Sequence, residues 1–192
     1  MNIEALDKGF SSIEIAFSLV EFSYRIQTLG ISQMRALFYH EVEVKGVLIE
    51  GKEMDEEDVL RFFLNHLNSA ICSFWIAIDE AFEKVFGKKN PKANSIIEDF
   101  RAVIYMFRCA FAHEISEPKW YVRDAAYRRR PYRLSVPPEC RCGGVDEFFF
   151  DFTLLHGQNV KTKAFKHFRG LATFSKMACE LLKQTTHQNN GK

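Results

Sequence analysis

The stretch of sequence that decides the fold is Ala93-Asn-Ser-Ile-Ile-Glu-Asp-Phe-Arg-Ala-Val-Ile-Tyr-Met-Phe-Arg-Cys-Ala-Phe-Ala-His113. Its apolar side chains recur at steps of three and four residues, at Ile96, Ile97, Phe100, Val103, Ile104, Phe107 and Phe111. That spacing matches the turn of an α-helix and predicts a helix over residues 93–113 with a broad apolar face. Pro118 follows closely, so we expect the helix to end before it.

A second long helix is predicted upstream, from about Glu56 to Phe86. The acidic residues 55–58 stand at its start, where they complement the positive end of the helix dipole. Residues 87–91, Gly-Lys-Lys-Asn-Pro, break the pattern and form a short turn. Two long helices joined by so short a turn are expected to pack against each other in antiparallel orientation.

Two further helices are predicted from the same periodicity, one over residues 9–29 and one over residues 161–183. The four helices together predict a mainly α-helical bundle, to which the last helix returns. The polar residues from Gln184 onward are expected to fray. With 192 residues and 47% apolar composition, the chain can bury one sizeable core, which predicts a single domain over residues 1–192.

Residues 119–152 have a different character from the helices. Alternating apolar residues, prolines and a Gly-Gly pair predict two or three strands there, in a small antiparallel β insert. The candidate strands are Trp120-Tyr-Val-Arg, Tyr132-Arg-Leu-Ser-Val and Glu147-Phe-Phe-Phe-Asp-Phe. Residues 39–51 contain β-branched residues in partial alternation and two glycines, which is typical of either a short hairpin or an ordered loop.

Charge is distributed unevenly along the chain, although the formal net charge is only +1. Residues 1–100 carry 10 Lys and Arg against 17 Asp and Glu, whereas residues 101–170 carry 13 against 7. A basic block of this kind is what a phosphate-binding surface needs. No apolar run reaches the length of a membrane span and no signal-like start is present, so we expect a cytoplasmic protein without membrane contact.

The five cysteines are an odd number scattered through predicted helices, which favours reduced thiols over disulfides. Only Cys140 and Cys142 are close in sequence. A Cys-x-Cys pair supplies half of a zinc site, and His156 is not at a recurring ligand spacing from it. We therefore expect no metal and no other cofactor.

Arg108 and His113 carry the clearest chemical signal. Arginine is a permanent cation that can hold a phosphate, and histidine can move a proton near neutral pH. Metal-free RNA cleavage needs a base for the 2′-hydroxyl, a cation for the developing phosphorane charge and an acid for the leaving 5′-oxygen. Two residues that are five apart on a helix differ by roughly 140° in direction around the helix axis. The side chains of Arg108 and His113 can therefore converge only because Arg108 is long and His113 lies near the helix end.

The stretch Arg101 to His113 resembles the Arg-x4-His signature of the HEPN superfamily, a family of helical domains rich in toxin and antiviral endoribonucleases. The resemblance covers about residues 56–120. It implies a HEPN-like helical bundle in which Arg108 is the phosphate clamp and His113 the base or acid, with two protomers lining one cleft. It also implies an active homodimer, an RNA substrate and a protein partner such as a cognate antitoxin.

This chain departs from the family pattern at two positions. Cys109 stands where many members place a polar residue such as Asn directly after the Arg, so a neighbouring hydrogen bond is lost. Ile115 stands where some toxin members carry a Tyr that is modified by the antitoxin. Because the family also contains members without catalysis, two alternatives remain: an inactive HEPN-like module that binds RNA or a protein, and an unrelated bundle in which the motif is coincidental. A bundle is also compatible with Arg108 as a surface cation and His113 as a residue that caps the helix dipole.

The arginine-rich segment after the motif is a second candidate for RNA contact. Arginines suit phosphates, and the interleaved tyrosines suit base stacking. The candidate RNA-binding residues are Arg123, Arg128, Arg129, Arg130, Arg133 and Tyr127. The same residues fit a solvated loop that aids solubility equally well.

Overall fold

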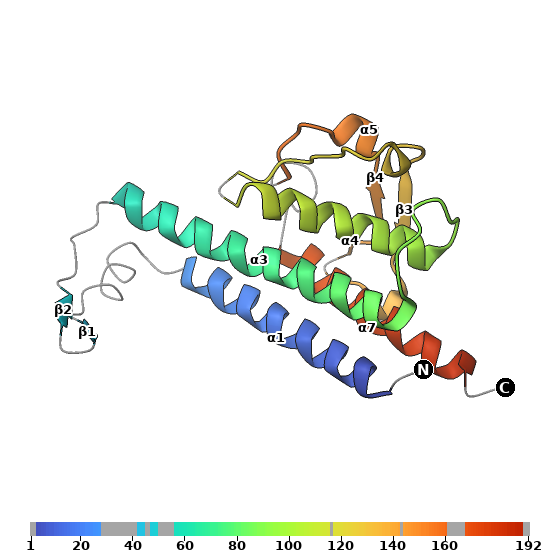
Figure 1. Ribbon diagram of the computed structural model, residues 1–192, viewed down its shortest axis with the longest axis horizontal. Coiled ribbons are helices and arrows are strands. Elements are labelled where there is room, and N and C mark those ends of the chain that lie inside the picture. Colours follow the sequence, from blue (N-terminus) through green and yellow to red (C-terminus); the bar gives the residue numbers. More distant parts are fainter. Residues whose placement is uncertain are drawn as a thin grey trace.

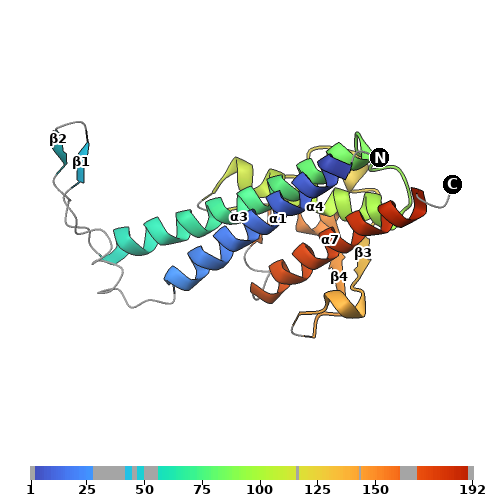
Figure 2. The same ribbon diagram turned by 90° about the horizontal axis from the view of Figure 1, so that it is seen from below.

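Four long helices form the framework of this computed structural model, which describes residues 3–27, 42–44, 47–49, 56–115, 117–142, 144–160 and 168–189. They are α1 (Ile3–Gln27), α3 (Glu56–Phe86), α4 (Ile96–His113) and α7 (Phe168–Asn189). Helices α1, α3 and α4 lie side by side, each antiparallel to its neighbour (Figure 1), and α7 packs along α1 and α3 (Figure 2). Within the described residues, no helix is both long and apolar enough to cross a membrane.

Two small antiparallel strand pairs accompany the helices. Strands β1 (Val42–Val44) and β2 (Val47–Ile49) pair with each other, as do β3 (Tyr132–Ser135) and β4 (Glu147–Phe150). In the second pair Tyr132 lies opposite Phe150, and Leu134 opposite Phe148. Three short helical turns complete the described elements, at Ala125–Tyr127 (η1), Pro138–Cys140 (η2) and Phe152–Leu155 (α5).

The structure confirms the predicted mainly α-helical bundle with a small β insert, and it corrects several details. The segment Trp120-Tyr-Val-Arg is extended but is not a strand, because its neighbour Lys119 forms only an isolated bridge with Asn159. The last helix does not fray at Gln184 but continues to Asn189. The predicted start of that helix, residues 161–167, lies outside the described residues.

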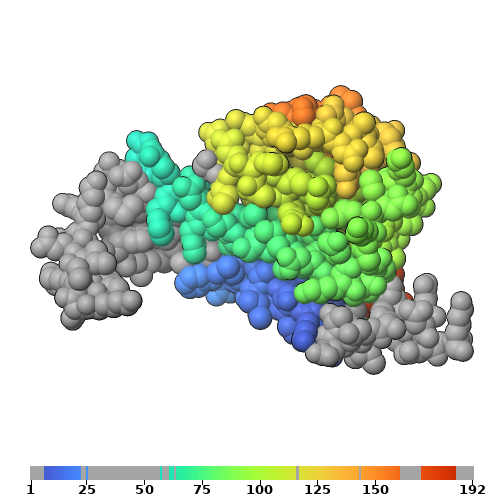
Figure 3. Space-filling model, viewed as in Figure 1, coloured from blue at the N-terminus to red at the C-terminus, as the bar shows by residue number. Residues whose placement is uncertain are grey.

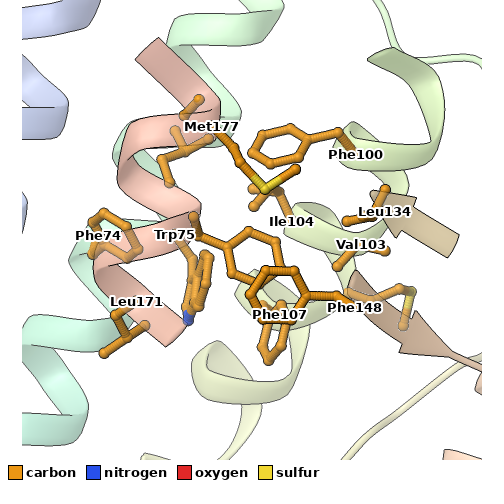
Figure 4. Close-up of a cluster of buried hydrophobic side chains, with 14 of the residues drawn as sticks. Phe74, Trp75, Phe100, Val103, Ile104, Phe107, Leu134, Phe148, Leu171 and Met177 are labelled. Atoms are coloured by element: carbon orange, nitrogen blue, oxygen red, sulfur yellow. The ribbon is translucent and has the colours of Figure 1, made fainter. Parts of the chain in front are cut away.

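Aromatic side chains from distant segments build the core (Figure 4). Trp75 of α3 and Phe107 of α4 stack with ring centroids 4.4 Å apart. Phe174 of α7 lies within ring-contact distance of both, and also of Phe148 on β4 at 4.4 Å. Because strands β3 and β4 present alternate side chains inward, the insert packs onto the same core as the helices.

Helix α4 is capped at its N-terminal end by Ser95, whose side chain accepts a hydrogen bond from the Glu98 backbone N–H at 3.2 Å. The Glu98 carboxylate accepts from the Asn90 N–H at 2.6 Å and so ties the preceding turn to the helix. Glu98 also pairs with the buried Arg101 at 2.6 Å. Strand β3, which follows α4 in the sequence, also packs against α4. In the space-filling view, the yellow and orange residues that follow α4 lie at the top of the molecule (Figure 3).

All five cysteines are free thiols, and burial changes the pKa of four of them. Burial raises the pKa of the Cys72, Cys109 and Cys140 thiols, and it raises the pKa of the Cys179 thiol on α7 from its ordinary value of 9.0 to about 11. These thiols therefore stay protonated at neutral pH.

The raised pKa of Cys179 predicts a loss of stability in alkaline solution. The thiol is protonated in both states below pH 9, whereas between pH 9 and about 11 it ionises only in the unfolded chain and so favours unfolding. We expect the free energy of unfolding to fall over this range, and to fall less in Cys179→Ala. Urea titrations at pH 7, 9 and 10.5 measure the difference between the two proteins, and an equal fall in both would contradict the assignment.

Candidate functional site

The C-terminal end of α4 places His113 at the protein surface. His113 is the last residue of the helix, and the extended Glu114 follows it. The side chain of the buried Asn68 on α3 donates to the Ile115 carbonyl at 2.6 Å and so anchors the chain just beyond the helix. His113 is exposed at the end of the helix, and the backbone just beyond it is held in place.

Arg108 lies on a different side of α4 and is held by a buried carboxylate. Its Nη1 donates to Asp79 Oδ2 on α3 at 2.7 Å, and the Asp79 side chain is 1% exposed whereas that of Arg108 is 37% exposed. Lys89, from the turn between α3 and α4, also binds Asp79 at 3.1 Å. The hydrogen bond to Asp79 raises the pKa of Arg108, so this guanidinium is a permanent cation.

Tyrosines surround this ion cluster on its α4 side. The Lys89 ammonium lies 4.1 Å from the centre of the Tyr105 ring, which stacks on Tyr127 at 5.3 Å. A hydrogen bond with Cys109 raises the pKa of the Tyr105 hydroxyl. Cys109, the residue that follows Arg108, is thus a neighbour of Tyr105 on the same helix.

A cavity of about 240 Å³ opens beside His113. It is lined by Ala110, His113, Glu114, Lys119, Tyr121 and Arg123. Arg108 is not among the lining residues, so the structure does not bring the two motif residues into one cavity of this chain. The lining includes two cations, Lys119 and Arg123, and one carboxylate, Glu114, while Lys119 also pairs with Glu117 Oε2 at 3.6 Å just outside the lining. The lining itself therefore carries an excess of positive charge, which favours an anion.

A second histidine, His156, lies next to Tyr121, which is one of the residues that line the cavity. The Tyr121 ring lies 6.1 Å from the His113 ring and 6.0 Å from the His156 ring, measured between centroids. The Val122 backbone N–H donates to His156 Nδ1 at 3.2 Å, so Nδ1 is the acceptor and Nε2 carries the proton in the neutral ring. One hydrogen bond therefore sets both the orientation and the tautomer of His156.

The predicted RNA-binding arginines are mostly engaged within the protein. Arg128 donates to the Val122 carbonyl, Arg129 donates to the Pro91 and Ala93 carbonyls at 3.0 and 3.1 Å, and Arg130 pairs with Asp99. These contacts fasten the loop after η1 to the start of α4. Arg133 pairs with Glu147 across the β3–β4 pair at 3.2 Å.

The other two predicted RNA-binding residues, Tyr127 and Arg123, have different surroundings from these four arginines. Tyr127 is buried against Tyr105, so its ring offers no surface on which a base could stack in this arrangement. Arg123 is exposed and lines the cavity, and no carboxylate of the described residues pairs with it. Of the predicted set, Arg123 alone lines the same cavity as His113.

Sequence reasoning did not assign Lys119 to the site and could not place His156, and it named Tyr121 only as one of the tyrosines interleaved with the arginines. The alternation in residues 120–123 predicted a strand and not a row of cavity-lining side chains. The side chains of residues 161–169, His167 among them, are not described. Among the described residues, no three His, Cys, Asp or Glu side chains are grouped as metal ligands.

Comparisons with known proteins do not extend this description. No protein-family model matches the chain, and neither the curated proteins nor the solved structures contain a match.

Proposed function

We propose that this protein is a metal-independent endoribonuclease of HEPN type, in which His113 transfers a proton and Arg108 stabilises phosphate charge. The observation that carries the proposal is the exposed His113 at the edge of a cavity lined by Lys119, Tyr121 and Arg123. These are the side chains that suit a phosphate and a base, next to a histidine, whose imidazole can transfer a proton.

The reaction proposed for this site is transesterification within the RNA strand. His113 takes the proton of a 2′-hydroxyl, and the 2′-oxygen attacks the adjacent phosphorus. The bond from phosphorus to the 5′-oxygen breaks, and an acid protonates that oxygen. The products are a 2′,3′-cyclic phosphate and a 5′-hydroxyl end, which differ from the products of metal-dependent hydrolysis.

A homodimer is the proposed active unit, because the cavity of one chain is lined by a single histidine, whereas the reaction needs both a base and an acid. Two copies facing each other would supply a second histidine and a second arginine to one cleft. The proposed biological setting is toxin or defence-related RNA cleavage, with a cognate antitoxin or another protein as partner.

Cleavage of labelled RNA in EDTA tests the catalytic proposal. We expect wild type to produce cyclic phosphate ends and His113→Ala to cut about 100-fold more slowly, since a positioned acid or base contributes about 10²–10⁴-fold. His66→Ala is the matched control, because His66 lies on α3 and stacks on Phe62, 6.3 Å away. Sedimentation of each variant checks folding and dimerisation.

A binding module without catalysis is the second candidate function. The position of Arg108 favours it, because that guanidinium is bound to a buried carboxylate and does not line the cavity. In the same experiment, a folded wild-type protein that binds RNA and leaves it intact would select this candidate. Equal cutting by wild type and His113→Ala would remove His113 from the mechanism.

A further inference from the structure

We infer that the cavity beside His113 binds one unstacked base of single-stranded RNA between Tyr121 and Arg123, with the adjoining phosphate at Lys119. The choice of RNA rests on the function proposed above. The binding site itself rests on the geometry of residues 117–123, which belong to no part of the Arg-x4-His motif.

Lys119, Tyr121 and Arg123 form a row because the chain is extended there. Alternate residues of an extended chain point to opposite sides. Trp120 and Val122 are buried in the core, so the three residues between and beside them face outward and line the cavity together. Their common orientation follows from the burial of their two neighbours.

Backbone hydrogen bonds to residues 157–160 hold this row in place. The Trp120 N–H donates to the Gln158 carbonyl at 2.9 Å, and the Gly157 N–H donates to the Trp120 carbonyl at 2.8 Å. The Val160 N–H donates to the Pro118 carbonyl at 2.8 Å. The site is therefore formed before a ligand arrives, which lowers the entropic cost of binding.

The Tyr121 ring has the properties of a base-stacking platform. It is 47% exposed although it is a large aromatic ring, and the rings of His113 and His156 lie beside it at 6.1 and 6.0 Å. The orientation of His156 is in turn fixed by Val122. Every base has a π-face, so stacking on an exposed tyrosine recognises single strands without requiring a particular sequence.

Arg123 lies over the same ring, about an ångström closer than the insertion of a base requires. Its guanidinium carbon is 5.9 Å from the Tyr121 centroid. A base stacked on both groups needs roughly 7 Å between them, because each contact takes about 3.5 Å. An exposed arginine side chain supplies the missing ångström or so by rotation about its own bonds.

The size of the cavity favours one base of a polymer over a whole free ligand. Its volume of about 240 Å³ is below the range of about 300–1,000 Å³ typical of pockets that enclose a small molecule. A duplex keeps its bases paired and stacked, so it cannot place one between Tyr121 and Arg123. Single-stranded loops and ends can.

Binding of an 8-nucleotide 2′-O-methyl RNA, followed by fluorescence anisotropy at one salt concentration, tests the inference. This oligomer lacks the nucleophilic hydroxyl, so wild-type protein can be used whether or not it cleaves RNA. We expect Tyr121→Leu to weaken binding roughly 10- to 100-fold, because stacking contributes about 1–3 kcal/mol per base. Arg123→Ala should also weaken binding, whereas Tyr121→Phe keeps the ring and should bind as wild type does.

Phe149→Leu is the matched control, because Phe149 is a 50% exposed aromatic ring beneath Arg133, at 4.9 Å. It should bind RNA as tightly as wild type. The inference is overturned if Tyr121→Leu binds as wild type does, or if wild type does not bind the oligomer. A duplex of the same sequence that binds equally well would also overturn it, as would displacement by UMP or AMP at the oligomer's own dissociation constant. Loss of binding in Tyr121→Leu together with uncut natural RNA would uphold the inference and refute only the catalytic proposal.

Discussion

Phe174→Ala is expected to destabilise the protein by about 3–5 kcal/mol, the range observed for truncating a buried aromatic residue to alanine. Phe174 is fully buried on α7. Its ring lies 5.4 Å from that of Trp75 on α3 and 4.4 Å from that of Phe148 on β4. The substitution therefore leaves a cavity at the point where the helices and the β insert meet, and neighbours fixed by their own backbones fill it only in part.

Urea denaturation at neutral pH measures this effect. Leu154→Ala on α5 is the matched control, because Leu154 is exposed and its truncation should change stability by no more than about 0.5 kcal/mol. A loss below about 1 kcal/mol in Phe174→Ala would mean that α7 does not pack on α3 and β4 as described. The unfolding can be followed by a helical and by an aromatic spectroscopic signal. If the denaturant midpoint falls equally for both signals, the insert and the helices unfold as one unit.

Asp79→Ala is expected to cost about 2–3 kcal/mol, because it leaves two cations in a poorly hydrated position without their counter-ion. Loss of one partner from a fully buried pair costs about 3–5 kcal/mol. We expect less here, since Arg108 is 37% and Lys89 17% exposed and both retain some contact with water.

A double-mutant cycle of Asp79→Ala with Arg108→Ala measures the coupling between the two side chains. A cycle energy of about 1 kcal/mol or more is expected for a direct, partly buried contact. Additive effects would contradict the contact at 2.7 Å. The same variants separate two roles of Arg108, because a structural role lowers stability without changing cleavage by the folded protein, whereas a catalytic role lowers the cleavage rate at unchanged fold.

The helices were predictable from sequence because their signals are local. The apolar steps in residues 96–111 follow the helical period. Helix α3 was predicted to start at the acidic residues 55–58 and to end at about Phe86, and it spans Glu56–Phe86. Strands were predicted within residues 132–136 and 147–152, and the structure pairs residues 132–135 with 147–150. These strands could be predicted because alternation and turn residues are local as well. Residues 120–123 were misread because alternation marks any extended segment, paired or not.

The candidate site depended on contacts that sequence does not encode locally. Nothing near Arg108 in the sequence indicates Asp79, which lies 29 residues away and turns a predicted phosphate clamp into half of a partly buried ion pair. Nothing near Tyr127 indicates that its ring is covered by Tyr105. The arginines of residues 128–130 read as a free basic patch. Only the packed structure shows that Arg129 and Arg130 bind residues 91–99 and that Arg128 donates to the Val122 carbonyl.

The sequence by itself determined the helical bundle, the small β insert and the position of His113 at a helix end, because each follows from periodicity or helix ends within one segment. Only the tertiary structure decided which cations face that histidine. Burial of Trp120 and Val122 directs Lys119, Tyr121 and Arg123 into the cavity, while the buried Asp79 holds Arg108 elsewhere. Both outcomes depend on which surfaces pack together and on the cost of burying charge, and those are properties of the whole fold.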